Sequence, residues 1–393
     1  IDQKVYICSV GIDDFQSIND RFGHASGDEI LKKVADRLSY FLDDNKPLAR
    51  MGDEFYFYLL EDKREENIHK RCNDILENLN QSYFTYDNLV YITASMGVSV
   101  YPDDSRDAKT LIRNSSLAMH SVKEKVTQKI DYYSSNVEEN LSERKKLEGE
   151  LANALNEEEF ILHYQPFVST DDEKRVGMEA LIRWQHPEKG MISPGVFIPL
   201  AEETGMIKEI GDWVLKEACT QLKYIHDNIN DQLFVSVNVS PEQFRSENFV
   251  KNVQNTLLET GLEPEHLEVE ITERTVMGNI DYTLKSLKKL KNMGVKVALD
   301  DFGTGYSSLS YLKEFDLNVL KIDKSFIDDF LENASNRAIV NTIITIGHNL
   351  NMQVVAEGVE TKAQAEKLKE LGCDIIQGYL YSKPKAIEQL FEL

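Results

Sequence analysis

Eight short apolar runs, separated by segments of helical length, constrain the fold of this chain more than any other feature of its sequence. The runs cover residues 161–166, 176–184, 233–240, 267–273, 295–299, 318–326, 353–360 and 375–380. Alternation of strands with helices is typical of a mostly parallel sheet. Eight such units in roughly 250 residues match a (β/α)8 barrel, whose chemistry lies at the C-terminal mouth of the strands. The last two-thirds of the chain is therefore predicted to be a TIM-like barrel.

The fifth run ends in two adjacent carboxylates, Asp300 and Asp301, which a glycine-rich turn follows. Like charges repel, and neither carboxylate would stay ionised in a dry core, so we expect a cationic group between them. An aspartate pair can also belong to a solvated loop, but polar residues recur within or at the ends of the other runs. They are Gln165, Glu179, Arg183, Asn238, Glu268, Glu270, Glu273, Lys321, Asp323, Glu357, Glu360 and Gln377.

Composition narrows the partners and the compartment. The length of 393 residues suggests two domains, and the net charge of −23 argues against a nucleic-acid polymer or an anionic membrane as a general partner. The four cysteines lack metal-binding spacing, which indicates buried thiols in a reducing cytosol. No run reaches the roughly 18 apolar residues of a membrane helix. We expect a cytoplasmic chain, or the cytoplasmic part of a membrane-anchored protein, whose upstream sensor domain is missing because the sequence starts abruptly in a predicted strand.

Residues 1–130 are predicted to form a separate α/β domain around a central, mostly antiparallel sheet. Strands are expected at 4–12 and 90–100 with a hairpin at 49–60, and helices after residue 28 and near 66–79 and 108–125. Residues 131–158 form a charged linker helix, and residues 159–393 form the barrel domain. The helix either docks on the barrel or carries a signal between the domains, and the sequence leaves both open. Its apolar stripe contains Leu147, Leu151, Ala154 and Leu155.

The first domain carries one specific motif combination, FxxINDxxGHxxGD at 15–28 followed by GDEF at 52–55. This combination resembles the GGDEF family of diguanylate cyclases, which join two GTP molecules into cyclic di-GMP. The resemblance implies that Asn19 and Asp28 contact the guanine base of GTP. The alternative is that Asn19 and Asp28 are only a loop cap and a helix N-cap, roles that short polar residues fill well.

Departures from that family predict that the domain makes no cyclic di-GMP. Gly11 stands where the family has an aspartate metal ligand, and phosphoryl transfer depends on metal-neutralised charge. Met51 disrupts the glycine pair of the signature, where backbone close to phosphate usually needs glycine. The inhibitory product site is missing at 42–45, Gln16 replaces a frequent lysine, and His120 replaces a frequent tyrosine. A GTP-binding regulator is favoured slightly over an inert scaffold, because the family residues that survive are Asn19, Asp28, Glu54 and Lys123.

From residue 159 onward the chain resembles the EAL family of cyclic di-GMP phosphodiesterases. The tripeptide EAL alone would be uninformative, but an ordered set with one element per predicted strand is specific. The matching segments are YQP at 164–166, EALIRW at 179–184, VNVS at 237–240, EVEITE at 268–273, LDDFGTGYSSL at 299–309, LKIDKSF at 320–326, VAEGVET at 355–361 and QGYLYSKP at 377–384. The resemblance implies hydrolysis of cyclic di-GMP to the linear dinucleotide pGpG.

Two divalent ions close together can lower the pKa of a water and clamp a phosphodiester, and Mg2+ or Mn2+ prefers oxygen ligands. By resemblance, the first ion is held by Glu179, Asn238, Glu270 and Asp300. The second is held by Asp300 and Asp301, with Glu357 nearby, through water. The alternative is a set of mouth acids without metal, which would repel one another strongly.

The resemblance also implies roles around the metals. Lys321 orients or deprotonates the attacking water or stabilises charge, and Arg183 pairs with a substrate phosphate. Glu273 ties down the turn at 303–308 or is a plain surface carboxylate, and Glu268 is only structural or on the surface. The further substrate contacts are Gln165, Leu181, Asp323, Glu360, Gln377 and Tyr379.

These patterns predict a metal-dependent cyclic di-GMP phosphodiesterase, dimeric through its barrel, with a regulatory first domain. One alternative is a receptor that binds cyclic di-GMP without hydrolysing it, which the intact metal acids disfavour. Another is a bifunctional cyclase–phosphodiesterase, which Gly11 and the altered hairpin disfavour.

Overall fold

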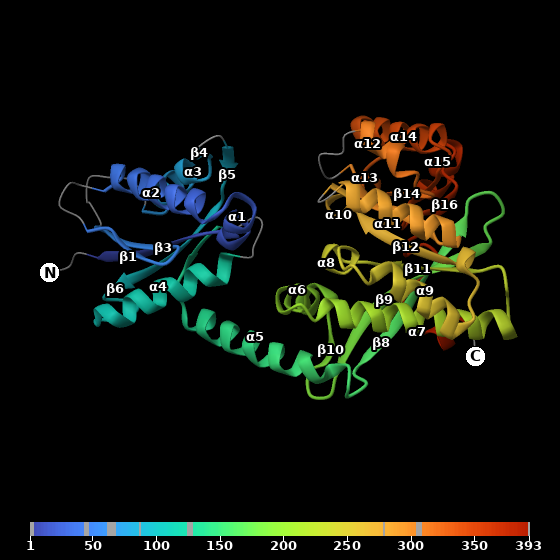
Figure 1. The fold of residues 1–393 in the computed structure, drawn as a ribbon, viewed down its shortest axis with the longest axis horizontal. Helices are drawn as coiled ribbons and strands as arrows, with labels where there is room; N and C mark the ends of the chain where they lie inside the picture. The colour runs from blue at the N-terminus through green and yellow to red at the C-terminus, as the bar shows by residue number, and fades with distance from the viewer. Residues whose placement is uncertain are drawn as a thin grey trace. The chain divides into compact units, whose positions relative to one another are not determined.

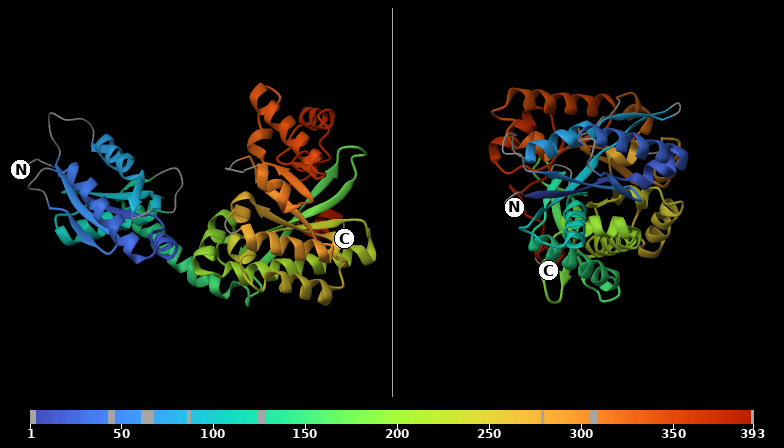
Figure 2. Two further views of the ribbon diagram at one scale, coloured as in Figure 1. Left: turned by 45° about the horizontal axis from the view of Figure 1, so that its top comes forward. Right: turned by 90° about the vertical axis from the view of Figure 1, so that its left-hand side faces the viewer.

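The computed structural model describes residues 4–42, 47–60, 68–85, 88–123, 129–277, 280–303 and 309–391. The chain folds into two compact units, Ile1–Leu147 and Glu148–Leu393 (Figures 1 and 2). Most of the turn predicted at 303–308, and most of the 42–45 window, lie outside the described residues.

The first unit is built on a five-stranded sheet in the order β2-β3-β1-β6-β7. The central strand β1 runs antiparallel to both β3 and β6, which confirms the predicted mostly antiparallel sheet. Alternate residues of β3 are buried, as expected for a strand with one face on the core. The strands are β1 Val5–Ile12, β2 Ala49–Met51, β3 Glu54–Leu60, β6 Ala94–Tyr101 and β7 Ile130–Tyr132.

Helices and a small hairpin complete this unit. The prediction of one continuous strand at 90–100 is wrong, because the structure has two strands there, β5 and β6. Between them, Ile92 and Thr93 form backbone hydrogen bonds to Gln81 and Asp13. The chain is therefore divided there between two sheets. The remaining elements are α1 Phe15–Phe22, α2 His24–Tyr40, α3 Ile68–Leu79, β4 Ser82–Thr85, β5 Asn88–Tyr91 and α4 Ala108–Lys123.

The predicted linker helix is α5, Ser135–Ala154. Its last turns belong to the second unit, where Glu150 accepts from His186 Nε2 at 3.1 Å and pairs with Lys189 Nζ at 3.3 Å. Leu151 and Ala154 are buried. The end of the helix therefore docks on the barrel, while its role in carrying a signal stays a prediction.

The second unit closes into a barrel of the eight predicted strands. Seven of the eight strands form a parallel series from β9 to β16, and β8 closes the ring by pairing with both β16 and β9. The strands are β8 Phe160–Ser169, β9 Arg175–His186, β11 Phe234–Asn238, β12 Leu267–Thr272, β13 Lys296–Phe302, β14 Val319–Ile322, β15 Gln353–Ala356 and β16 Ile375–Ile376.

The first strand departs from the predicted repeat of parallel strands, because β8 runs antiparallel to both of its neighbours. Only residues 170–174 join β8 to β9, and that is too short for the helical crossover that parallel strands need. A short strand β10, Gly190–Ile192, folds back on the end of β9. Inside the barrel, an apolar cluster fills the space below the mouth and consists of Phe167, Ala298, Val319, Val355 and Ile375.

Helices surround the barrel, as Figure 1 shows. Among the described helices, none has both the length and the apolar character needed to cross a bilayer. They are α6 Pro194–Thr204, α7 Ile207–Asn228, α8 Pro241–Phe244, α9 Phe249–Thr260, η1 Pro264–His266, α10 Glu273–Met277, α11 Ile280–Met293, α12 Leu309–Phe315, α13 Lys324–Ile327, α14 Ala334–Asn349, α15 Lys362–Glu370 and α16 Ile387–Phe391.

Candidate active site at the barrel mouth

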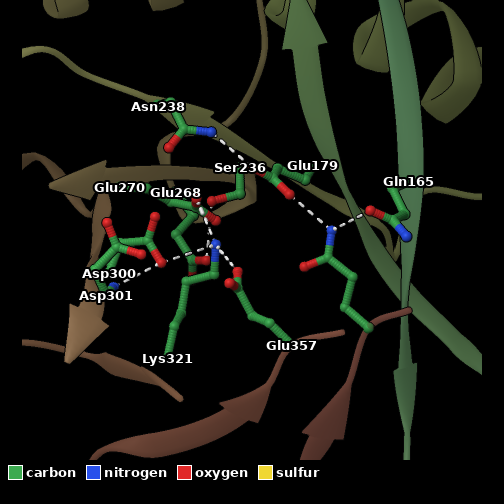
Figure 3. Close-up of polar contacts among 11 residues, drawn as sticks. Gln165, Glu179, Ser236, Asn238, Glu268, Glu270, Asp300, Asp301, Lys321 and Glu357 are labelled. Atoms are coloured by element: carbon green, nitrogen blue, oxygen red, sulfur yellow. Dashed lines mark hydrogen bonds and ion pairs between the residues drawn. The ribbon is translucent and has the colours of Figure 1, made fainter. Parts of the chain in front are cut away.

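The barrel brings the predicted metal and catalytic residues together from six neighbouring strands (Figure 3). Parallel strands end at the same edge of the sheet, so polar residues far apart in sequence meet at one mouth. They are Glu179 on β9, Asn238 on β11, Glu270 on β12, Asp300 and Asp301 on β13, Lys321 on β14, and Glu357 just after β15.

Lys321 is the centre of this cluster. Its Nζ lies 2.6 Å from Glu270 Oε2, 2.6 Å from Glu357 Oε1 and 3.5 Å from Asp300 Oδ1. The side chains of Lys321 and Glu270 are 1% and 0% exposed. A buried ion pair is stable only when its charges are matched and hydrogen-bonded. Here one ammonium faces three carboxylates, so the site carries an excess of acid groups.

The pKa values reflect this excess. Burial raises the pKa of Glu270 well above its usual range although Lys321 acts to lower it, and burial raises the pKa of Glu357 to about 7. Burial acts to lower the pKa of Lys321, but the charges of Glu270, Glu357 and Asp300 hold that pKa well above the ordinary value. Further positive charge at the mouth would favour the ionised carboxylates.

A second network fixes Glu179. Asn238 Nδ2 donates to Glu179 Oε1 at 2.6 Å, and Gln377 Nε2 donates to Glu179 Oε2 at 2.7 Å. Gln377 Nε2 also lies 3.2 Å from Gln165 Oε1, and Gln165 Nε2 donates to the carbonyl of Ser382 at 3.1 Å. Both oxygens of Glu179 therefore have fixed directions: Asn238 comes from the neighbouring strand β11, and Gln377, just after β16, reaches Glu179 because the barrel closes through β8.

Asp301 adopts a backbone conformation that is uncommon for residues other than glycine. Its φ is 56°, in the left-handed region, and the pairing of β13 with β14 shifts register between Leu299 and Phe302. Neighbouring residues of a regular strand point to opposite faces, so this irregularity lets Asp300 and Asp301 share the mouth (Figure 3). Burial, followed by the charge of Asp300, raises the pKa of Asp301. Strain of this kind is typical of functional sites.

The donor set fits a divalent cation. The mouth offers carboxylate and amide oxygens, the hard ligands that Mg2+ and Mn2+ prefer. Glu270 Oε1 is buried and has no hydrogen-bond partner among the described residues, so it has a ligand position to offer. In the part of the chain that the structure describes, no three acidic, histidine or cysteine side chains already surround one point as ligands would. Glu270 and Glu357 instead point at Lys321, and Glu179 at two amides.

Predicted substrate residues lie beside this cluster. Arg183 is half-buried on β9, where burial lowers its pKa and nearby Glu179 and Tyr379 act to raise it. Arg183 Nη1 donates to the backbone carbonyl of Ile182 at 2.8 Å. Tyr379 is 55% exposed, and Lys383 Nζ lies 5.3 Å from its ring centre. Leu181 is partly exposed on β9. An exposed aromatic ring beside a guanidinium suits a ligand with a base and a phosphate.

Two other predicted contacts have local structural partners. Asp323 caps α13 by accepting from the backbone N–H of Ser325 at 3.1 Å, and Glu360 pairs with Lys324 Nζ at 2.5 Å. Glu273 begins α10 and is 6% exposed, so the surface alternative for it is wrong. The turn that Glu273 was expected to hold lies mostly outside the described residues.

Sequence reasoning undervalued Glu268. This residue is buried inside the barrel, accepts from Ser236 Oγ at 3.1 Å, and has a pKa that burial raises and Lys321 acts to lower. The signal was available, because Glu268 and Glu270 are two residues apart on one strand and so share a face.

The cyclase-like site of the first unit is crowded. A Cβ at Gly11 would lie 2.8 Å from Met119 Sδ, closer than real contacts allow. The surviving carboxylate, Glu54, has its pKa lowered by His120, whose Nε2 lies 3.0 Å from Glu54 Oε1. Tyr56 donates to the other oxygen of Glu54. Both oxygens of Glu54 are thus already bound by side chains of this domain, His120 and Tyr56.

The proposed guanine contacts lie close to each other. Asn19 is inside α1, and its side chain packs on Gly27, where an added Cβ would collide with it. Asp28, the next residue, is exposed within α2, whose N-cap is Gly23. The N-cap alternative for Asp28 is therefore wrong, and the loop-cap alternative for Asn19 stays a prediction.

Fold and site together define a TIM-like barrel with an acidic, oxygen-rich mouth built around a buried lysine. The chain belongs to the EAL domain family, whose model matches residues 148–384. Residues 1–129 match the model for the diguanylate cyclase GGDEF domain.

Curated relatives share this two-domain order. The chain is 39% identical over 389 residues to the bifunctional diguanylate cyclase/cyclic di-GMP phosphodiesterase MucR of Pseudomonas aeruginosa, covering 99% of this chain and 57% of MucR. It is 36% identical over 381 residues to the cyclic di-GMP phosphodiesterase NbdA of the same species, covering 97% of this chain and 49% of NbdA. The chain thus spans about half the length of these relatives.

Solved structures agree with the fold. A PaMucR phosphodiesterase in complex with c-di-GMP superposes with a TM-score of 0.61 at 46% identity, covering 62% of this chain and 99% of that one. The cAMP-bound EAL enzyme Bd1971 superposes with a TM-score of 0.62 at 26% identity, covering 88% of this chain and 91% of that one. These matches confirm the barrel predicted from the eight apolar runs.

Proposed function

We propose that this protein hydrolyses cyclic di-GMP to linear pGpG at the mouth of the EAL barrel. The observation that carries the proposal is the cluster around Lys321, which gathers the carboxylates that phosphodiester hydrolysis requires. The names of MucR and NbdA support the choice of substrate.

The mouth residues divide into metal ligands and substrate contacts. The residues that would hold the first Mg2+ or Mn2+ ion are Glu179, Asn238, Glu270 and Asp300; Asp300 and Asp301 would hold the second, with Glu357 nearby. When bound, the ions supply a hydroxide at neutral pH and neutralise the phosphate. The chain itself holds a proton and a positive charge at Lys321 Nζ, beside the carboxylates of the mouth.

Substrate orientation falls to the residues around this centre. Arg183 binds a phosphate, because its half-buried guanidinium has no carboxylate within ion-pair distance in the described structure. The exposed ring of Tyr379 offers a surface on which a guanine base stacks. The remaining contacts are Gln165, Leu181, Asp323, Glu360 and Gln377.

We also propose that the first domain, residues 1–130, is a regulator that binds GTP through Asn19 and Asp28 and makes no cyclic di-GMP. Gly11 offers no carboxylate, and the end of the Met119 side chain lies beside it. The linker is residues 131–158, and the barrel of residues 159–393 forms a homodimer in the cytoplasm. A bifunctional enzyme is the competing possibility, because MucR is named as one.

Chromatography of products tests the barrel activity. The full chain, incubated with cyclic di-GMP and Mg2+, is expected to yield pGpG. Binding of cyclic di-GMP without any loss of it would instead identify a receptor.

Calorimetric titration with GTP tests the regulator, paired with hydrolysis rates with and without GTP. We expect binding, a change in rate, and loss of both in Asp28→Ala. A coupling of about 1–3 kcal/mol would change the apparent affinity by roughly 5- to 150-fold. No binding at millimolar GTP, or binding that leaves the rate unchanged, would make the domain a scaffold.

A further inference from the structure

Lys321 contacts carboxylates that the proposed metal site also needs. Its ammonium lies within 3.5 Å of oxygens from Glu270, Glu357 and Asp300. The lysine is 1% exposed, so these carboxylates and not solvent are its counter-charges. A small cation enclosed by carboxylate oxygens is also the arrangement that a divalent ion adopts.

We propose that Lys321 competes with divalent cations for the same carboxylates and thereby sets the metal affinity of the mouth. The inference rests on the metal site proposed above. It goes beyond that site by giving Lys321 a role in ion binding that is separate from handling the attacking water.

The contacts show where competition is strongest. Glu270 uses Oε2 for Lys321 and keeps Oε1 without a partner among the described residues, so it can serve the lysine and an ion together. Glu357 is directed at Lys321 through Oε1, at 2.6 Å, and turns toward an ion only if this contact lengthens. In addition, an ammonium a few ångströms from a divalent ion repels it, and burial of Lys321 and Glu270 strengthens this repulsion. Both effects weaken ion binding.

Lys321 can also be expected to strengthen ion binding, in which case its loss would lower the metal affinity instead of raising it. Lys321 could hold mutually repelling carboxylates in place, so that its loss would scatter the ligands and weaken ion binding. The change in metal affinity on neutralising Lys321 therefore decides between competition and pre-organisation.

The test is a titration of the full chain with Mn2+ alone, at one pH, after removal of bound ions with a chelator. Lys321→Met keeps most of the side-chain length and removes the charge. We expect this variant to bind Mn2+ at least about tenfold more tightly than the wild type, because a buried like charge is gone. Without Mn2+ it should unfold at a lower temperature, because it leaves buried carboxylates uncompensated.

Lys321→Met could fold only when metal is present, and a titration of the metal-free chain would then fail. In that case the Mn2+ affinity is measured from the unfolding temperature over a series of Mn2+ concentrations. An ion that binds the folded state raises the unfolding temperature by mass action, so the concentration at which that rise begins reports the affinity. The rise should begin at lower Mn2+ in Lys321→Met than in the wild type. Lys321→Arg, which keeps the charge, should show no tightening.

The matched control is Lys324→Met, which removes an exposed lysine that also has two carboxylate partners, Asp328 at 3.2 Å and Glu360 at 2.5 Å. Its Mn2+ affinity should equal that of the wild type. Equal or weaker binding in Lys321→Met, with the wild type still binding Mn2+, would overturn the competition and leave the metal site standing. Absence of Mn2+ binding in the wild type would overturn both.

Discussion

Replacing Glu179 with alanine separates catalysis from stability. The structure predicts a small loss of stability and a large loss of hydrolytic activity. The substitution removes the acceptor of two amides, Asn238 and Gln377. Asn238 is exposed and can bond to water, whereas Gln377 is 3% exposed. Gln377 keeps its 3.2 Å contact with Gln165. One partly satisfied buried donor costs about 1 kcal/mol, which lowers the melting temperature of a domain of this size by about 2–4 °C.

The expected loss of activity is much larger. Removing one main electrostatic element from an active site typically lowers kcat by about 100- to 1,000-fold. Hydrolysis of cyclic di-GMP with saturating Mg2+ is measured by chromatography, and stability by thermal unfolding of the same samples. Glu179→Gln should recover much of the stability, because its one side-chain oxygen can still accept from the buried Gln377, but not the activity. Glu259→Ala, an exposed glutamate paired with Lys216, is the control. A wild-type rate in Glu179→Ala would refute the assignment of the metal site.

Three further predictions follow from other contacts. Chelation of divalent ions should stop hydrolysis while circular dichroism still reports a folded chain; continued turnover in excess EDTA would argue against metal dependence. A Glu179→Ala chain given GTP and Mg2+ should make no cyclic di-GMP, because Gly11 supplies no carboxylate for a metal ion; any product above background contradicts this. Gly97→Ala should destabilise the first unit by about 2 kcal/mol or more, because its Cβ would collide with the backbone of Ser115; an unchanged denaturation midpoint would show that α4 moves freely.

The architecture of the barrel was predictable because each buried strand is a short apolar run between turn signals. The reversed direction of β8 was not predicted, although its short connection to β9, residues 170–174, was visible in the sequence. Length alone excluded a helix there. The apolar pattern also predicted one strand where the structure has β5 and β6. The residue types at 92 and 93 give no sign that their backbone groups bond to Gln81 and Asp13.

In the candidate site, too, some residues could be predicted from the sequence and others could not. Strand ends identified Asp300 and Glu357, since residues at the mouth follow directly from the barrel fold. The bond between Gln377 and Glu179 was not predictable, because β16 and β9 come near each other only when the barrel closes through β8. The left-handed backbone of Asp301 was equally hidden, since aspartate carries no glycine-like signal for it.

Phosphorus NMR of the full chain with cyclic di-GMP and Mg2+ tests most directly whether the barrel opens one phosphodiester bond of this substrate. The two phosphates of cyclic di-GMP are equivalent and give one diester signal. Opening one of them should replace that signal with equal amounts of a diester and a terminal monoester, in time with substrate loss. An unchanged single signal would contradict hydrolysis, and monoester without remaining diester would contradict pGpG as the product.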